Sequence, residues 1–216
     1  MHKILVINPN SNVLVTEKMQ DSFDNHSPNG SVGVDFITLS GAPFGIETDA
    51  DIKFVEPLII NKISDELDEY DAFVIACYSD PGLNEAKQIF KKPIYGIHET
   101  SVKFCTKLRH NFGVIALGDE SIQRHINYIK GLNLESYYIG ENALNISVNE
   151  AVSDKSTFSK IIISGRDLIE KQRVEMIILG CAGLAKHRAA VERELGVKVI
   201  DPVQTSVEVA VDNLIN

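Results

Sequence analysis

Cysteine is scarce in this chain of 216 residues, and the three that it has lie far apart: Cys77, Cys105 and Cys181. An odd number of widely spaced cysteines does not resemble the disulfide framework of a small secreted protein, so we expect free thiols in a reducing compartment. Long apolar runs are missing too. The run at residues 4–7 is shorter than a signal sequence requires, and the others are too short to cross a bilayer. The sequence predicts a cytoplasmic protein that does not enter the membrane.

The chain has fewer basic than acidic residues. Lys and Arg number 21 against 30 Asp and Glu, which gives a formal net charge of -9. Without a stripe of basic residues such a surface repels phosphate backbones, so we expect no nucleic-acid partner. The motifs HExxH, Cys-x-x-Cys, P-loop and G-x-G-x-x-G are also missing, and neither a metal nor a nucleotide cofactor is expected. What remains is an ordinary globular composition, 44 % apolar and 24 % charged.

Short apolar runs alternate along the chain with stretches that have helical spacing. Helical repeats are clear over residues 52–67, 158–169 and 203–214, with Pro57 predicting a kink in the first of them. Apolar strands separated by helices indicate parallel sheets covered on both faces, hence an α/β fold. The segment 132–154 is the least regular and is expected to hold an extra strand and a loop. The runs predicted as strands are residues 3–7, 32–39, 72–76, 94–97, 112–117, 176–179 and 197–200.

The chain also repeats itself. The tetrapeptides at residues 99–102 and 204–207 share the letters Thr-Ser-Val, and each follows a short predicted strand. The separation between Cys77 and Cys181 is nearly the same as the separation between the two tetrapeptides. Each cysteine follows a buried strand and shortly precedes glycine and leucine. We therefore predict two α/β halves, residues 1–97 and 98–201. The last helix, residues 202–216, is expected to pack back on the first half.

Cys77 and Cys181 are the candidate catalytic residues. Each ends a buried strand just before a predicted helix, and ligands of open α/β sheets bind at that edge. A helix N-terminus favours negative charge and lowers the pKa of a thiol. If the halves face each other across a cleft, two thiols flank one ligand, as stereoinversion by a base on one face and an acid on the other requires. The alternative is that both cysteines are small core residues, which is the role expected of Cys105.

Three motifs carry a resemblance to a known family. They are Asn8-Pro9-Asn10-Ser11 after the first strand, residues 76–83 (ACYSDPGL) and residues 179–184 (LGCAGL), with weaker matches at 41–47 and 93–97. In these motifs the chain resembles the aspartate/glutamate/hydantoin racemase superfamily, and within it the hydantoin and allantoin racemases. The resemblance implies two flavodoxin-like halves with the active site between them, and a catalytic thiol pair at Cys77 and Cys181. It also implies no metal, no pyridoxal phosphate and a homo-oligomer.

The neighbours of the two cysteines favour the hydantoin branch. Amino-acid racemases of the superfamily typically have Asn-Thr and Thr-Glu after their cysteines, whereas this chain has Tyr78-Ser79 and Ala182-Gly183. Less polar neighbours suit a neutral ring. The resemblance therefore implies racemisation of a 5-substituted hydantoin or of allantoin by 1,1-proton transfer between two thiols. Tyr78 departs from the Phe common in the family, and its hydroxyl is expected either to contact the substrate or to reach water.

Other residues near these motifs are candidate substrate contacts. Asn10 is expected to hydrogen-bond a ring carbonyl, and Ser11 is expected to cap a helix. Asp80 is expected to cap the helix entered at Pro81. Ser79 is expected either to bind the substrate or to cap the same helix. Ile46, in a loop rich in glycine and proline, is expected to cover the site or to belong to an ordinary connection.

The small residues Ala182 and Gly183 are expected to offer backbone amides to an enolate oxygen, in a tight turn between strand and helix. His98 follows a strand end, where a helix-start histidine with satisfied hydrogen bonds is favoured over a catalytic one.

Three alternatives to a hydantoin racemase stay open. The first is an amino-acid racemase of the same superfamily. The second is a related decarboxylase or cis–trans isomerase, although such decarboxylases keep one of the two cysteines. The third is a non-catalytic small-molecule sensor, for which two unreactive thiols are expected.

Overall fold

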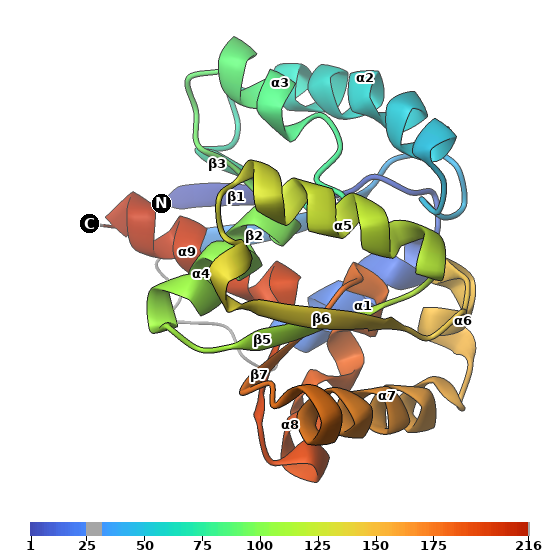
Figure 1. Cartoon of the computed structure of the whole chain (residues 1–216). Helices are drawn as coiled ribbons and strands as arrows, with labels where there is room; N and C mark the ends of the chain where they lie inside the picture. Colours follow the sequence, from blue (N-terminus) through green and yellow to red (C-terminus); the bar gives the residue numbers. More distant parts are fainter. Residues whose placement is uncertain (25–31, 216) are drawn as a thin grey trace.

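Two parallel four-stranded sheets form the framework of the computed structural model, which describes residues 1–24 and 32–215 (Figure 1). The first sheet has the strand order β2-β1-β3-β4 and the second the order β6-β5-β7-β8. The second order is the first with every number raised by four, so the two sheets are equivalent in topology. The strands are β1 (His2–Asn8), β2 (Val32–Thr38), β3 (Ala72–Ile75), β4 (Ile94–Gly96), β5 (Phe112–Ala116), β6 (Tyr138–Ala143), β7 (Met176–Leu179) and β8 (Lys198–Ile200).

Four helices lie between the two sheets (Figure 1): α1 (Val13–Asp24), α4 (Ile97–Leu108), α5 (Asp119–Gly131) and α9 (Pro202–Ile215). Alternate residues of each sheet point into this layer. Val6 and Val74 from the first sheet and Val114 and Ile178 from the second belong to the same buried cluster. The two halves therefore share one continuous core, and Cys105 of α4 lies in it, fully buried.

The outer face of each sheet is covered by its own helices. On the first sheet Leu5 and Phe73 pack with α2 (Asp49–Asp65) and α3 (Leu83–Ile89), and α2 continues through Pro57. On the second sheet Ile177 packs with α7 (Thr157–Gln172) and α8 (Arg188–Leu195). Figure 1 shows these two layers at opposite ends of the molecule. Shorter elements complete the chain: α6 (Val148–Ser153) and the 3-10 helices η1 (Glu135–Tyr137) and η2 (Ala182–His187).

The repeat at residues 99–102 and 204–207 has a structural counterpart. Ser101 donates its hydroxyl to the Ile97 carbonyl at 2.7 Å, and Ser206 donates to the Pro202 carbonyl at the same distance. These equivalent serines stand in the first turns of α4 and α9, which pack against each other. Helix α9 also contacts β1 and β3 of the first sheet, and α1 and η2. The division of the chain at residues 97/98 and 201/202 stays a prediction.

The predicted α/β architecture of two equivalent parallel sheets is confirmed. The irregular segment 132–154 contains the extra strand β6, followed by the short helix α6. Helix α5 was not singled out by its sequence pattern. Within the described ranges, no helix is long and apolar enough to span a membrane.

Candidate active site

One cavity of about 440 Å³ lies where the carboxyl ends of both sheets meet. Loops that follow β1, β2, β3, β5, β6 and β7 supply its walls, so it belongs to both halves. Most of the sequence-predicted site residues line it. They are Asn10, Ile46, Cys77, Tyr78, Ser79, Cys181 and Ala182. Ser11 and Gly183 are not among its lining residues.

Cys77 and Cys181 enter the cavity from equivalent positions, each two residues after its central strand, β3 or β7. Burial raises the pKa of the Cys77 thiol to about 11, and hydrogen bonding from Ser79 offsets this only in part. Burial likewise raises the pKa of the Cys181 thiol to about 12, although its Sγ accepts the Gly183 amide at 3.3 Å. The charge of an ionised Cys77 also disfavours ionisation of Cys181. Both thiols are therefore protonated at neutral pH.

This result differs from the thiolates expected at helix N-termini, and the local structure gives the reason. After Cys77 the chain makes a turn, and α3 begins only at Leu83. After Cys181 comes the six-residue 3-10 helix η2 in place of an α-helix. Neither sulfur faces the start of a long helix, so loss of water outweighs the few amide hydrogen bonds that it receives.

The loop after β1 is held by a network of asparagine side chains. The Asn10 Oδ1 accepts from Asn8 Nδ2 at 3.0 Å and from the Asn12 amide at 2.9 Å. Its carboxamide nitrogen is then the group that Asn10 offers to a ligand. The expected cap at Ser11 is wrong: Asn12 accepts the Leu14 amide at 3.1 Å and caps α1, because it directly precedes Val13. The Ser11 amide instead donates to the Pro43 carbonyl at 2.9 Å.

Tyr78 lines the cavity, but most of its ring lies in the shared core. Only 3 % of it is exposed, and its hydroxyl is buried. The hydroxyl therefore does not reach bulk water, and its contact with a substrate stays a prediction. Its ring stacks on His98 with centroids 4.1 Å apart. His98 is fully buried in the first turn of α4, and a hydrogen bond with the Tyr78 backbone offsets part of the effect of burial on its pKa. Its role as a satisfied histidine at a helix start stays a prediction.

Asp80 caps a helix, but not the predicted one. Its carboxylate accepts the amides of His98 at 3.0 Å and Glu99 at 2.7 Å, at the start of α4. Helix α3 is capped by Gly82, without a side-chain hydrogen bond. Asp80 adopts the left-handed conformation, with φ 45°, and donates its amide to the Cys77 carbonyl at 2.9 Å. The turn that carries Cys77 is thus tied to the N-terminus of α4, and burial raises the pKa of Asp80 to about 7.

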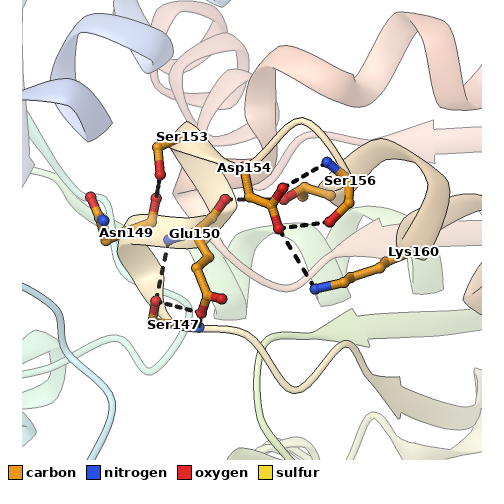
Figure 2. Close-up of polar contacts among 8 residues, drawn as sticks. Ser147, Asn149, Glu150, Ser153, Asp154, Ser156 and Lys160 are labelled. Carbon is orange, nitrogen blue, oxygen red and sulfur yellow. Dashed lines mark hydrogen bonds and ion pairs between the residues drawn. The ribbon is translucent and has the colours of Figure 1, made fainter.

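A loop of the first half covers the cavity and meets α6 of the second half. Ile46 lines the cavity, and Glu47 accepts the Val148 amide at 2.8 Å through Oε1. That amide stands at the start of α6, which a capping box between Ser147 and Glu150 fixes, as Figure 2 shows. Ile46 thus lines the cavity in a loop that contacts the second half, and its contact with a substrate stays a prediction.

Sequence reasoning missed the residues that α5 and its preceding loop bring to the cavity. Leu117, Arg124 and His125 line it. Arg124 reaches across to the first half, where its Nη1 lies 2.7 Å from Asp49 Oδ1, and its charge lowers the pKa of Cys77. A signal was available for Leu117 but not for the two α5 residues, because residues at the carboxyl end of a parallel strand meet at the same sheet edge. Residues 112–117 were predicted as such a strand.

The Ala182 side of the cavity is small and apolar. Ala182 is buried and belongs to the shared core, beside Val148 and Val152. The Gly183 amide is directed at Cys181 Sγ, so it supports the sulfur rather than pointing at a ligand. Among residues 1–24 and 32–215, no three side chains of His, Cys, Asp or Glu are grouped so as to hold a metal ion. Independence from metals and cofactors stays a prediction.

Known proteins are similar to this chain over almost its whole length. The family model of Asp/Glu/hydantoin racemases matches residues 4–210. A hydantoin racemase from a Pseudomonas species is 32 % identical over 215 residues, covering 96 % of this chain and 84 % of the relative. A hydantoin racemase from Paenarthrobacter aurescens is 26 % identical over 212 residues, covering 96 % and 89 % of the two chains.

Solved structures show the same fold. The allantoin racemase from Klebsiella pneumoniae superposes with a TM-score of 0.92 at 22 % identity, over 100 % of this chain and 88 % of that one. A glutamate racemase from Francisella tularensis subsp. tularensis is more distant, with a TM-score of 0.68 at 17 % identity, over 99 % and 81 % of the two chains. The resemblance carried by the cysteine motifs is confirmed, and the chain belongs to the Asp/Glu/hydantoin racemase family.

Proposed function

We propose that this racemase inverts the stereocentre of a 5-substituted hydantoin or of allantoin, using Cys77 and Cys181 as its two acid/base groups. One observation carries the proposal: both thiols line one cavity from equivalent strand ends of two equivalent sheets. A ring bound between them has one sulfur on each face of its chiral carbon.

The chemistry follows from this placement. One cysteine first loses its proton to solvent, and the resulting thiolate takes the proton from the chiral carbon. The electrons of the broken C–H bond move into the adjacent carbonyl to give a planar enolate. The other cysteine, as thiol, returns a proton to the opposite face while the carbonyl re-forms. A matched pair lets the roles exchange for the other enantiomer. No step in this scheme needs a metal or an organic cofactor.

Part of the cavity lining suits the ring of a small substrate. Val15, Leu117 and Ile146 supply apolar surface, while the Asn10 carboxamide and Ser79 supply hydrogen bonds. Ala182 and Ile46 add further apolar surface. The relatives named as hydantoin racemases favour a hydantoin. Assembly into a homo-oligomer and a cytoplasmic location, expected from the sequence, stay predictions.

Loss of optical rotation tests the function directly. Single enantiomers of several 5-substituted hydantoins, of allantoin and of aspartate and glutamate are incubated with the protein and followed by circular dichroism. We expect at least one cyclic substrate to racemise fully and the amino acids to keep their signal. The acidic amino acids belong in the panel because Arg124 lines the cavity and attracts carboxylates. Racemisation of an amino acid alone would replace our proposal with the amino-acid branch.

The raised pKa values predict how the thiols react with iodoacetamide. The reactive form is the thiolate, and with a pKa of about 11 for Cys77 its population rises about tenfold per pH unit between pH 7 and 10. We expect the alkylation rate of Cys77 to rise with pH in the same way. Cys181 should be alkylated more slowly at each pH, because its pKa is about 12. Peptide mass spectrometry at each pH measures both rates.

Slow alkylation at neutral pH is thus expected of the enzyme as well as of a sensor. The two are separated by ligand protection: a substrate between the thiols slows alkylation of both, while Cys105 in the core stays unchanged. A rate at Cys77 that levels off near pH 8 would contradict the raised pKa.

A further inference from the structure

A buried cluster of aromatic rings lies beside Cys77, and the two-thiol scheme makes no use of it. Tyr78 stacks on His98, and His125 meets these two rings edge-on with centroids 5.0 and 5.1 Å away. Tyr128 packs on His98 at 4.8 Å. Tyr78 and His125 also line the cavity, so the cluster connects the cavity to the protein interior.

His125 has an acidic partner in this cluster. Its Nδ1 lies 2.6 Å from Oε1 of Glu141, and the two side chains are 3 % and 0 % exposed. The Tyr138 hydroxyl donates to the other carboxylate oxygen of Glu141 at 3.3 Å. A carboxylate at Nδ1 fixes the orientation of an imidazole, and Nε2 is then the ring nitrogen left for a ligand in the cavity that His125 lines.

The partners in the cluster identify which ring is the donor. Burial, and then the interaction with His125, hold the pKa of His98 well below its usual range. His98 is therefore neutral, whereas Nδ1 of His125 lies beside the carboxylate of Glu141. When both ring nitrogens of His125 carry a proton, the Nδ1–H is bound to Glu141 and the Nε2–H is the donor left for a ligand. A donor held in a fixed orientation stabilises a developing anion better than reorienting water does.

We propose that His125 is a further catalytic residue, whose Nε2–H donates a hydrogen bond to the substrate carbonyl oxygen next to the stereocentre. This inference rests on the proposed function. As a thiolate takes the proton, the C–H electron pair moves toward that oxygen, which becomes the enolate oxygen. The opposite thiol then returns a proton to carbon and the carbonyl re-forms. His125 keeps its proton throughout, and Glu141 is a positioning residue that orients the ring.

Kinetics of His125→Gln tests the proposal. Because the donor acts on charge that develops in the transition state, kcat should fall about 100-fold while KM changes by less than about 3-fold. Glu141→Gln should lower kcat in the same direction by releasing the ring. The matched control is His110→Gln, which removes the histidine of an exposed pair with Glu175 at 3.6 Å and should leave kcat unchanged.

A series of substrates separates catalysis from a structural role. A 5-phenyl group spreads the carbanion charge into its own ring and leaves less on the enolate oxygen, whereas a 5-alkyl group does not. The loss in His125→Gln should therefore be larger for 5-alkyl than for 5-phenyl hydantoins. Equal losses for both, or a loss confined to KM, would overturn the proposal.

Binding of barbiturate provides a readout that does not depend on turnover. At neutral pH this planar ring is an anion with its charge on carbonyl oxygens, so it mimics the enolate. By calorimetry, His125→Gln should weaken its binding at least about 10-fold, as expected for a lost hydrogen bond to a charged group, while His110→Gln should not. Equal affinity for barbiturate in the wild type and His125→Gln would overturn the role of His125. If binding depends on His125 but no hydantoin racemises, the proposed function fails and the anion-binding role stands.

Discussion

Replacing either Cys77 or Cys181 by alanine should lower kcat for racemisation by about 10³-fold or more. Each variant leaves one face of the stereocentre without a proton donor or acceptor, and positioned acid/base groups of this kind contribute 10²- to 10⁴-fold, typically about 10³-fold. Both side chains line the cavity and neither is fully buried. Loss of activity should therefore not come from unfolding, and circular dichroism of the folded protein alongside polarimetry checks this.

Cys105→Ala is the matched control for this pair. Cys105 is the remaining cysteine of the chain and lies fully buried in the shared core, away from the cavity. Its replacement removes a buried sulfur, so we expect a loss of stability of about 1 kcal/mol with kcat retained. Retention of substantial racemase activity in Cys77→Ala or Cys181→Ala would remove that thiol from the mechanism.

Gly96→Ala should be the most destabilising of the small substitutions near the site. A Cβ at this position would stand 2.3–2.5 Å from the carboxylate atoms of Asp80. Asp80 would have to leave the amides of His98 and Glu99, which are buried. Overpacking together with loss of charge-assisted hydrogen bonds suggests a cost of about 3 kcal/mol, measured by urea unfolding.

Gly33→Ala is the control for this substitution. Gly33 also lies in a strand, β2, but a Cβ there meets its nearest atom at 3.6 Å, an ordinary contact. Its free energy of unfolding should stay within about 1 kcal/mol of the wild type. Because Asp80 anchors the turn of Cys77, Gly96→Ala should also lower turnover at temperatures where it is folded. Equal stability of the two variants would mean that Asp80 is not held as the structure shows.

Much of the fold was predictable because apolar strands of parallel sheets are continuous in sequence. The runs at residues 72–76 and 176–179 correspond closely to β3 and β7, and each of the two cysteines follows its strand by two residues. The edge strand β6 was harder to predict, since its residues are partly exposed and do not form an apolar run. That the two sheets share one core could not be read from the sequence, because periodicity shows which residues are buried but not against which partner.

The site was predictable in part for a similar reason. Cys77, Cys181 and Asn10 could be singled out because each follows a predicted strand, and the carboxyl ends of parallel strands form the ligand-binding edge. His125 lies too far along α5 for that argument, and its carboxylate partner Glu141 comes from another element. The raised pKa of each thiol also escaped prediction, since it depends on burial by loops that are distant in sequence.

The most direct test of the two-thiol account is solvent-deuterium incorporation by the single-cysteine variants. In D₂O each variant keeps one thiol, which removes and returns a proton on its own face without inversion. Cys77→Ala should therefore exchange the α-proton of one enantiomer, and Cys181→Ala that of the mirror image, as followed by NMR on resolved substrates. If both variants exchange the same enantiomer, or if either inverts its substrate, the two sulfurs do not act on opposite faces of one stereocentre.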